Sequence, residues 1–428
     1  MLLSTALIPP DDSVALPKPI GLAPLARVGF AGGDLLALGR RLIDRAKDTL
    51  AGDPDTLMDL SIIMQLAGNR EGGLAVQADA LKLQPIHRRL PANPSANGLR
   101  LLVFMAPGDF MANTPIEFLL EGSDVALDLL YLGPNIPAPE QIPEHDLAFV
   151  GISESDENRP ILEQLDTFID SWPRPVLNRP DSIIRLTRDG TSALLRAAPG
   201  ITIPRNTRIA RDDLARLGRG EIDLRAILDD GTFPIIARPA ASHAGQGLAK
   251  IENPSAIIEF LEDQPEADFY VARFVDYSGP DRQFRKYRIA FIDGRAYACH
   301  MAISSYWMVH YLNAGMTENE EKRAEEARWM ENFEREFAPR HERAFRVLAE
   351  RIGLDYFGID CAETRDGALL IFEVDIGMIV HDMDAPDMFP YKKKQMPKVF
   401  AAFRDLLAGA SRRAPGTTRV GTRRALSA

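Results

Sequence analysis

The stretch Tyr356-Phe-Gly-Ile-Asp-Cys-Ala-Glu-Thr-Arg-Asp-Gly-Ala-Leu-Leu-Ile-Phe-Glu-Val-Asp375 decides the fold prediction. Within it, two apolar, β-prone runs at 357–361 and 368–374 flank Arg365-Asp-Gly367, which has the composition of a tight turn. The two runs are therefore predicted to pair as an antiparallel β-hairpin.

Three carboxylates, Asp360, Glu373 and Asp375, lie on this predicted hairpin. Glu373 and Asp375 are two residues apart, so both side chains leave the same face of their strand, and Asp360 on the partner strand can share that face. Two or three carboxylates, with positions left for water and phosphate oxygens, describe a Mg²⁺ site that holds a nucleotide. The alternative is a hairpin whose acidic residues face solvent, but the strand is otherwise too apolar for a surface strand.

Length and composition limit the class of protein. With 428 residues, 46% hydrophobic and 26% charged, the chain has the composition of a soluble globular protein and is too long for one core. The net charge of −11 argues against nucleic acid or an anionic membrane as the main partner. Cys299 and Cys361 sit in apolar, strand-like runs and are expected to be buried thiols.

Nothing in the sequence predicts targeting or membrane insertion. Met1–Pro10 has no charged region before its short apolar run, and no window of about 18 uncharged apolar residues occurs, so we expect a cytoplasmic protein. The oligomeric state stays open, with a homo-oligomer as one outcome.

Changes of pattern divide the chain into parts. Residues 1–32, rich in Pro and Gly, predict an extended leader, and 33–97 predict a helical segment. Its last helix, 70–83, contains Gly73 and ends in Ala80-Leu-Lys-Leu-Gln-Pro85, which resembles one tetratricopeptide repeat; a plain helical appendage fits equally well. Residues 410–428, with five arginines, predict a disordered basic tail.

Between these ends the pattern is α/β. Four strand-like runs at 99–105, 125–131, 146–151 and 175–178, with helical segments between them, predict a small parallel sheet over 98–181. Residues 182–409 form a further unit that holds most of the chemistry. In this unit, 316–351 reads as a charged helix, and Tyr391-Lys-Lys-Lys394 reads either as an anion-binding segment or as an exposed helix start.

A glycine-containing loop precedes the carboxylate hairpin by about 120 residues. The strand that starts at Phe233 ends in Arg238, and a loop with Ser242, His243, Gly245 and Gly247 leads into another strand. Small residues let backbone N–H groups approach phosphate oxygens, and Arg238 adds positive charge. The loop lies between strands, so neither the P-loop nor the dinucleotide-binding fingerprint fits.

Two further strands, 285–292 and 296–303, predict a hairpin about Asp293-Gly294. Lys286 and Arg288 share a face of the first strand, and His300 on the second reads as a core or substrate-wall histidine.

In this order of elements, from about Asn178 to Ala408, the chain resembles the ATP-grasp superfamily of carboxylate–amine ligases. Gly358-Ile-Asp360 and Tyr287-Arg-Ile-Ala-Phe-Ile-Asp-Gly294 are most similar to glutathione synthetase and the ribosomal-protein glutamate-tail ligases. The resemblance implies an α/β fold: an α+β ATP-grasp core over 182–409, a small parallel α/β domain before it, and an N-terminal all-helical segment.

The resemblance also implies the site residues. Asp360, Glu373 and Asp375 would bind two Mg²⁺ ions, with Mn²⁺ as a substitute, and Arg288 and His243 would act on the transferring phosphoryl group. At the phosphates of ATP, the implied contacts are Arg238, the loop with Ser242, His243, Gly245 and Gly247, and Arg188 in place of a missing lysine. At adenine they are Ala272, Arg273, Phe274 and Val275. At ribose the implied contact is Asp276 or Asp281.

The implied activity is ATP-dependent joining of a carboxylate and an amine, on a small molecule or a peptide, through an acyl phosphate. Three residues depart from the family pattern, namely Asp375 where Asn is usual, Arg238 where Lys is usual, and Arg188-Asp-Gly190 where an Asp-Lys pair is usual. These departures keep open a non-catalytic nucleotide-binding or scaffold protein of the same fold, and a kinase that stops at a phosphorylated product.

Overall fold

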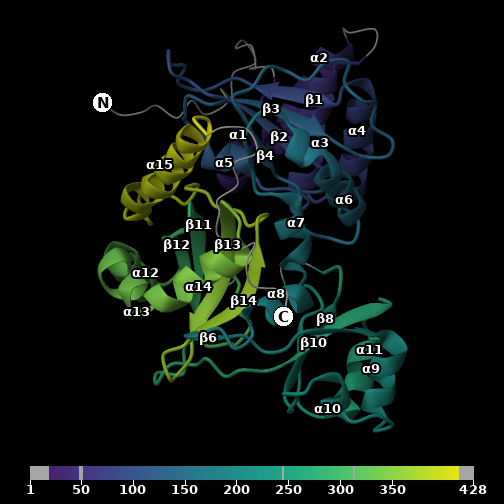
Figure 1. The fold of residues 1–428 in the computed structure, drawn as a ribbon, viewed down its shortest axis with the longest axis vertical. Coiled ribbons are helices and arrows are strands. Elements are labelled where there is room, and N and C mark those ends of the chain that lie inside the picture. The colour runs from purple at the N-terminus through teal and green to yellow at the C-terminus, as the bar shows by residue number, and fades with distance from the viewer. Residues whose placement is uncertain (1–18, 48–51, 243–244, 312–313, 414–428) are drawn as a thin grey trace.

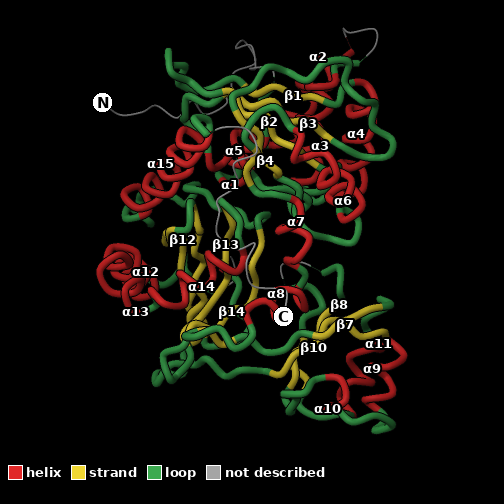
Figure 2. The backbone as a smooth tube through the Cα atoms, in the orientation of Figure 1, coloured by secondary structure: helices red, strands yellow, loops and turns green. Residues whose placement is uncertain are grey.

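The computed structural model describes residues 19–47, 52–242, 245–311 and 314–413. It contains three β-sheets with helices around them, which confirms the predicted α/β fold class. Figure 1 shows an N-terminal unit at one end, a central unit with a five-stranded sheet, and a smaller lobe at the other end. Figure 2 shows how the helices cover the sheets.

The strands fall into three sheets, taken here in spatial order. The first is β1 (Ile86–Arg89), β3 (Ala126–Tyr131), β2 (Arg100–Met105), β4 (Leu147–Val150) and β5 (Val176–Leu177). The second is β7 (Thr207–Ala210), β10 (Asp268–Arg273), β8 (Ile235–Pro239) and β9 (Ala249–Ile251). The third is β12 (Arg295–Ser304), β11 (Phe284–Ile292), β13 (Tyr356–Glu363), β14 (Leu369–Asp375) and β6 (Ile201–Thr202).

Helices pack around the three sheets. In the N-terminal unit they are α1 (Leu22–Phe30), α2 (Leu35–Lys47), α3 (Pro54–Leu66), α4 (Arg70–Leu83), α5 (Ile116–Leu119) and α6 (Arg159–Phe168). Next come α7 (Pro180–Ile183), α8 (Arg188–Leu195), α9 (Arg211–Gly218), α10 (Leu224–Ile227) and α11 (Ser255–Glu262). The last are α12 (Glu320–Asn332), α13 (Ala338–Arg340), α14 (Glu342–Ile352) and α15 (Lys392–Ala410).

The first sheet matches the prediction for 98–181, because β2, β3, β4 and β5 run parallel at the expected places. Their side chains are almost wholly buried, as expected of parallel strands covered on both faces. The sheet has one strand more than predicted. β1 pairs antiparallel with β3 at the edge, within a range predicted to be helical, so the helical segment ends before residue 86.

The predicted extended leader is wrong over Leu22–Phe30, which forms α1. Residues 1–18 lie outside the described part of the chain. The carboxylate of Asp59, buried in α3, accepts hydrogen bonds from Ile20 N–H and Gly21 N–H at 2.8 and 2.9 Å, which fixes the chain just before the helix. This contact joins residues 38 and 39 positions apart, so local sequence pattern does not reveal it.

The second and third sheets lie in the region predicted to resemble an ATP-grasp core. Both predicted hairpins are present: β11 pairs with β12 about Asp293-Gly294, and β13 pairs with β14 about Arg365-Asp-Gly367. Helix α15 packs against β11 and β12. The helix predicted over 316–351 starts at Glu320 and is interrupted by a π-helical turn, Phe333–Phe337, and by a turn at His341. Among the described helices, none combines the length and apolar character of a membrane span.

Gly73 lies where α4 packs against α3. A Cβ at this position would lie 2.6 Å from Gln65 Cγ and 2.9 Å from the backbone oxygen of Ser61. The close contact between the two helices therefore requires glycine at this position. A small residue where paired helices touch is the feature that α4 shares with a tetratricopeptide repeat, and membership of that repeat family stays a prediction.

We predict that Gly73→Ala destabilises the protein by about 1–3 kcal/mol, because the backbone at Ser61 cannot move aside without shifting α3. The matched control is Gly409→Ala in α15, where no atom lies within 4 Å of the new methyl group. That change should stabilise by up to about 1 kcal/mol through helix propensity. Urea unfolding of both variants measures the difference, and equal effects would contradict the close-contact argument.

Candidate functional site

A cleft of about 350 Å³ lies where the three units meet. The N-terminal unit contributes the segments 107–112 and 154–158, and α8 contributes Arg188 and Thr191. The small lobe contributes Arg208, Tyr270 and 240–242, and β14 contributes 372–375. Two of the three predicted metal-binding carboxylates, Glu373 and Asp375, therefore line the cleft together with Arg188 and Ser242.

Asp360 is buried in β13 and forms ion pairs with two cationic side chains. Arg288 donates from Nε to Oδ1 at 2.8 Å and from Nη2 to Oδ2 at 3.0 Å, and Lys286 donates to Oδ2 at 3.0 Å. Burial opposes ionisation of Asp360, but the two cations outweigh it and hold the pKa of the carboxyl well below its usual range. Lys286 and Arg288 share the face predicted for them.

Glu373 lies opposite Asp360 in the β13–β14 register and faces a different pair of cations. Its Oε1 accepts a hydrogen bond from Arg188 Nη2, and Arg238 adds positive charge nearby. These arginines overcome the effect of burial and lower the pKa of Glu373. In turn, burial and then the charge of Arg188 lower the pKa of Arg238 to about 10. The structure thus brings together Arg188, Arg238 and Glu373, as the resemblance implied.

Asp375 lines the same cleft but has a different hydrogen-bond partner. Its Oδ1 accepts from Gly377 N–H at 3.0 Å, and none of the described side chains forms an ion pair with it. Burial first, and then the negative charge of Glu373, raise the pKa of Asp375 to about 6. Within the described residues no three His, Cys, Asp or Glu side chains converge as a metal site requires, so the predicted trio of Asp360, Glu373 and Asp375 is not assembled.

A smaller set of donors has the chemistry that Mg²⁺ prefers. Asp360 and Glu373 are directly paired across two strands and both carry hard oxygen atoms, and those of Asp360 accept from Arg288 and Lys286 in this structure. Mg²⁺ commonly uses only one or two carboxylates and completes its shell with water and phosphate oxygens. These two residues suit that role, and the neighbouring cations suit phosphate.

The glycine loop borders the cleft through its first residues, 240–242. Arg238 donates from Nε to Ser242 Oγ at 3.2 Å and from Nη2 to the Ser242 carbonyl, so the strand end and the loop are tied together. Gly245 and Gly247 have φ angles of +79° and +63°, which favour glycine. His243 lies outside the described residues.

The residues predicted to hold adenine and ribose lie outside the cleft lining. Ala272 and Arg273 end β10, and Arg273 donates to Asp230 at 3.0 Å. The ring of Phe274 packs edge-on against Trp307 and lies under the Lys250 ammonium, and Val275 packs against the main core. Asp276 pairs with Arg365 at 2.9 Å and Asp281 with Arg285 at 2.7 Å. The nucleoside-binding role of this segment stays a prediction.

Sequence reasoning missed Thr191 at the cleft. Thr191 lines it with only 4% of its surface exposed, and its Oγ1 has no hydrogen-bond partner in the described part of the chain. Glu154 accepts from Arg159 at 2.6 Å. Burial, with Asp156 and Asp375 nearby, raises the pKa of Glu154 to about 7 despite that arginine. Glu154 belongs to Gly151-Ile-Ser-Glu-Ser155, which follows a buried parallel strand, and from the sequence this strand end is predicted to be a place where substrate could sit.

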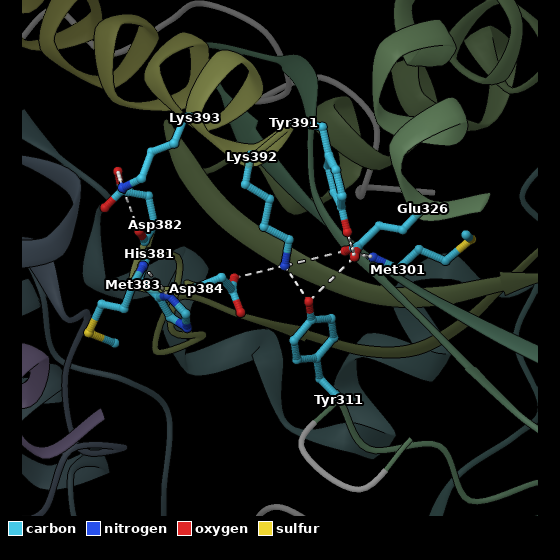
Figure 3. A network of polar contacts seen from close by, with 10 residues as sticks. All are labelled: Met301, Tyr311, Glu326, His381, Asp382, Met383, Asp384, Tyr391, Lys392 and Lys393. Carbon is cyan, nitrogen blue, oxygen red and sulfur yellow. Dashed lines mark hydrogen bonds and ion pairs between the residues drawn. The ribbon is translucent and has the colours of Figure 1, made fainter. Parts of the chain in front are cut away.

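Figure 3 shows a network of polar contacts around Lys392. The Lys392 ammonium contacts Tyr311 Oη, Asp384 Oδ2 at 2.8 Å and Glu326 Oε1 at 3.4 Å. Glu326 also accepts from Met301 N–H at 3.0 Å and from Tyr391 Oη at 2.5 Å. The lysine segment is therefore neither fully exposed nor a free anion site, because Lys392 is buried and already paired.

This network fixes two segments that border the site. Tyr311 lies in the loop after β12, and Asp384 lies in the segment after β14, near His381. The ring of Tyr311 lies 4.5 Å from the ring of His300, which stands opposite Arg288 in the β11–β12 register. Burial, and then the charge of Arg288, keep the pKa of His300 well below its usual value, so the ring is neutral.

Comparison with known proteins gives distant structural likenesses only. The RimK domain protein ATP-grasp from Sphaerobacter thermophilus is 16% identical, covering 72% of this chain and all of that one, with a TM-score of 0.39. The D-alanine–D-alanine ligase from Bacillus anthracis complexed with ATP is 14% identical, covering 73% and 96%, with a TM-score of 0.42. VanG D-Ala:D-Ser ligase from Enterococcus faecalis is 14% identical, covering 74% and 100%, with a TM-score of 0.43.

No family model matches the chain, and no curated protein matches it. Likenesses this distant do not assign an activity, so a function has to be argued from the residues of this chain.

The raised pKa of Glu154 makes a pH-dependent contribution to stability. Its folded-state pKa of about 7 exceeds the ordinary 4.5, so this residue favours folding below pH 4.5 and that contribution is lost as pH rises toward 7. We predict that Glu154→Gln removes this loss, so that the melting temperature falls less between pH 5 and pH 8 than in the unmodified protein. The control is Glu157→Gln, an exposed residue in the same turn. Parallel pH profiles for all three proteins would contradict the prediction.

The Lys392 network yields a stability prediction. Lys392→Met keeps the length of the side chain but leaves Glu326 and Asp384 buried without their cation, so unfolding free energy should fall by about 3–5 kcal/mol. The control is Lys393→Met; the side chain of Lys393 is 40% exposed, and its ammonium pairs with Asp382 at 3.0 Å. That change should cost at most about 1 kcal/mol. Urea unfolding measures both, and equal losses would show that the buried cluster is not special.

Proposed function

We propose that the protein is an ATP-dependent ligase that joins a carboxylate to an amine, on a small molecule or a peptide, through an acyl phosphate. The observation that carries the proposal is that carboxylates and cationic side chains alternate where β11, β13, β14 and α8 meet. Asp360 is paired with Arg288 and Lys286, and Glu373 is paired with Arg188 beside Arg238.

Such an array suits the triphosphate of a nucleotide. Arginine forks match phosphate oxygens in geometry and charge, and these cations come from three separate elements, β8, β11 and α8. The Ser242 loop lies beside them and would close over the terminal phosphate. Mg²⁺ held by Asp360 and Glu373 would, when bound, neutralise phosphate charge and orient the phosphates for transfer.

The chemistry then divides into two displacements. A carboxylate oxygen of the first substrate attacks the γ-phosphorus, the bond to the β–γ bridging oxygen breaks, and ADP leaves with that electron pair. The amine attacks the acyl carbon, and inorganic phosphate leaves as the amide forms and the amine loses a proton. Arg288, Arg188 and Arg238 stabilise the charge on the phosphoryl oxygens through both steps, since positioning and charge neutralisation supply catalysis of this class.

A second candidate is a protein that binds the nucleotide without turnover. It is favoured by the orientation of Asp375 toward Gly377, which leaves two carboxylates for metal where the resemblance implies three. The two candidates share nucleotide binding and differ in ADP release.

We predict that the protein binds ATP with Mg²⁺, and that Glu373→Gln weakens this binding by about tenfold or more because a ligand charge and the partner of Arg188 are lost. Titration calorimetry at millimolar ATP, with and without Mg²⁺, measures it. The control is Asp366→Asn, which removes the same charge from the exposed turn of the same hairpin and should change nothing.

Two outcomes test the activity itself. ADP release that requires a carboxylic acid, with an acyl hydroxamate formed when hydroxylamine is added, supports the ligase. Binding of MgATP without ADP release across a broad screen of acids and amines supports the non-catalytic protein. No binding of MgATP to the unmodified protein would refute both.

A further inference from the structure

Three oxygen atoms gather beside the cleft, at a corner to which Met111 and Asp375 of its lining belong. This corner lies where the segment after β4 meets the turn after β14. Ser153 is only 3% exposed, and its Oγ has no hydrogen-bond partner in the described part of the chain. A Cβ built on Gly377 would lie 2.5 Å from Ser153 Oγ, 3.2 Å from Asp375 Oδ2 and 3.2 Å from the carbonyl oxygen of Met111. Three oxygens therefore surround one face of Gly377.

The charge at this corner is unbalanced. Asp375 uses Oδ1 to accept from Gly377 N–H, which leaves Oδ2 toward Ser153. Glu154 is a second carboxylate that interacts with Asp375, and it is paired with Arg159 at 2.6 Å. Two other acids of the cleft are paired with cations: Asp109 with Arg70 at 2.7 Å, and Asp156 with Arg208 at 2.8 Å. Asp375 forms no ion pair with a described side chain, and Arg188 interacts with it through charge alone.

Carboxylate and carbonyl oxygens accept hydrogen bonds and cannot donate them, and a hydroxyl adapts to either role. A ligand that fits must therefore donate several hydrogen bonds and carry positive charge. A primary ammonium group has three donors and one charge on a compact head. The corner lies two residues along β14 from Glu373, so a group bound there sits beside the candidate phosphate-binding residues.

We propose that Ser153, Asp375 and the Met111 carbonyl form the binding site for the primary ammonium group of the amine substrate. Asp375 is the counter-ion and Ser153 a hydrogen-bond acceptor, with Glu154 strengthening the negative potential. The inference rests on the ligase proposal for its meaning, although ammonium binding is measurable without nucleotide. Small amines and the side chain of a lysine in a peptide share this chemistry.

The test uses the full chain without nucleotide and two fluorinated probes of the same size, 3-fluoropropylammonium and 3-fluoropropanol, followed by ¹⁹F NMR titration. The ammonium should bind saturably and at least about tenfold more tightly than the alcohol, since a charge-assisted contact is replaced by a neutral one. Asp375→Asn should weaken ammonium binding about tenfold, and Ser153→Ala several-fold. Glu157→Gln, which removes a charge from the same cleft wall, should leave it within about twofold.

Gly377→Ala gives a second variant that keeps every charge and fills the corner with a methyl group. It should abolish ammonium binding while thermal unfolding still reports a folded protein. Equal binding of ammonium and alcohol, or unchanged binding in both Asp375→Asn and Gly377→Ala, would overturn the proposal.

The two proposals fail separately. If MgATP does not bind the unmodified protein, the ligase proposal fails, and the titration still measures whether ammonium binds at the corner. If MgATP binds and ammonium does not, only the corner is wrongly assigned. Repeating the titration by competition with ethylamine and with a terminally blocked Gly-Lys-Gly peptide tells a small amine from a peptide lysine.

Discussion

The pairing of Asp360 with Arg288 and Lys286 is the contact on which the site depends. A carboxylate as buried as Asp360 is costly unless cations and hydrogen bonds surround it, and removing one partner from a buried pair costs about 3–5 kcal/mol. Its partners lie on β11, directly beside it in the sheet. Register and charge therefore support one another, because a one-residue slip would turn these side chains to the opposite face.

Glu373 extends this arrangement beyond the sheet. Through Arg188 it reaches α8, and its charge interaction with Arg238 reaches β8 of the small lobe. Three elements, β14, α8 and β8, thus meet around one carboxylate, and β14 and α8 also line the cleft. To the cleft lining the N-terminal unit contributes four acidic side chains and Arg70, whereas α8 and β7 contribute Arg188 and Arg208. The two walls are consequently suited to ligand groups of opposite charge.

The hairpins, the parallel sheet and the shared face of Lys286 and Arg288 could be read from the sequence, because period-two alternation and turn residues are local signals. The Arg188–Glu373 bond joins residues 185 positions apart and depends on how α8 packs against β14, so no local pattern encodes it. The burial of Lys392 was hidden for the same reason. From the sequence alone, a run of lysines at a helix start resembles an exposed segment. Only the folded structure places Glu326 and Asp384 around Lys392.

Two β-bulges explain why even the hairpin was only partly predictable. Between β13 and β14, Asp360 faces Glu373 but Cys361 faces Ile371, so Phe372 is an extra residue. Between β11 and β12, Arg288 faces His300 but Ile289 faces Ala298, so Cys299 is extra. Each bulge follows directly on a residue of the site, and a bulge bends the strand and re-aims the side chains beside it. Strict alternation would put Phe372 on the face away from the cleft, yet 372–375 all line it. The bulge at Phe372, which the sequence pattern does not predict, therefore explains how consecutive residues of β14 line the cleft.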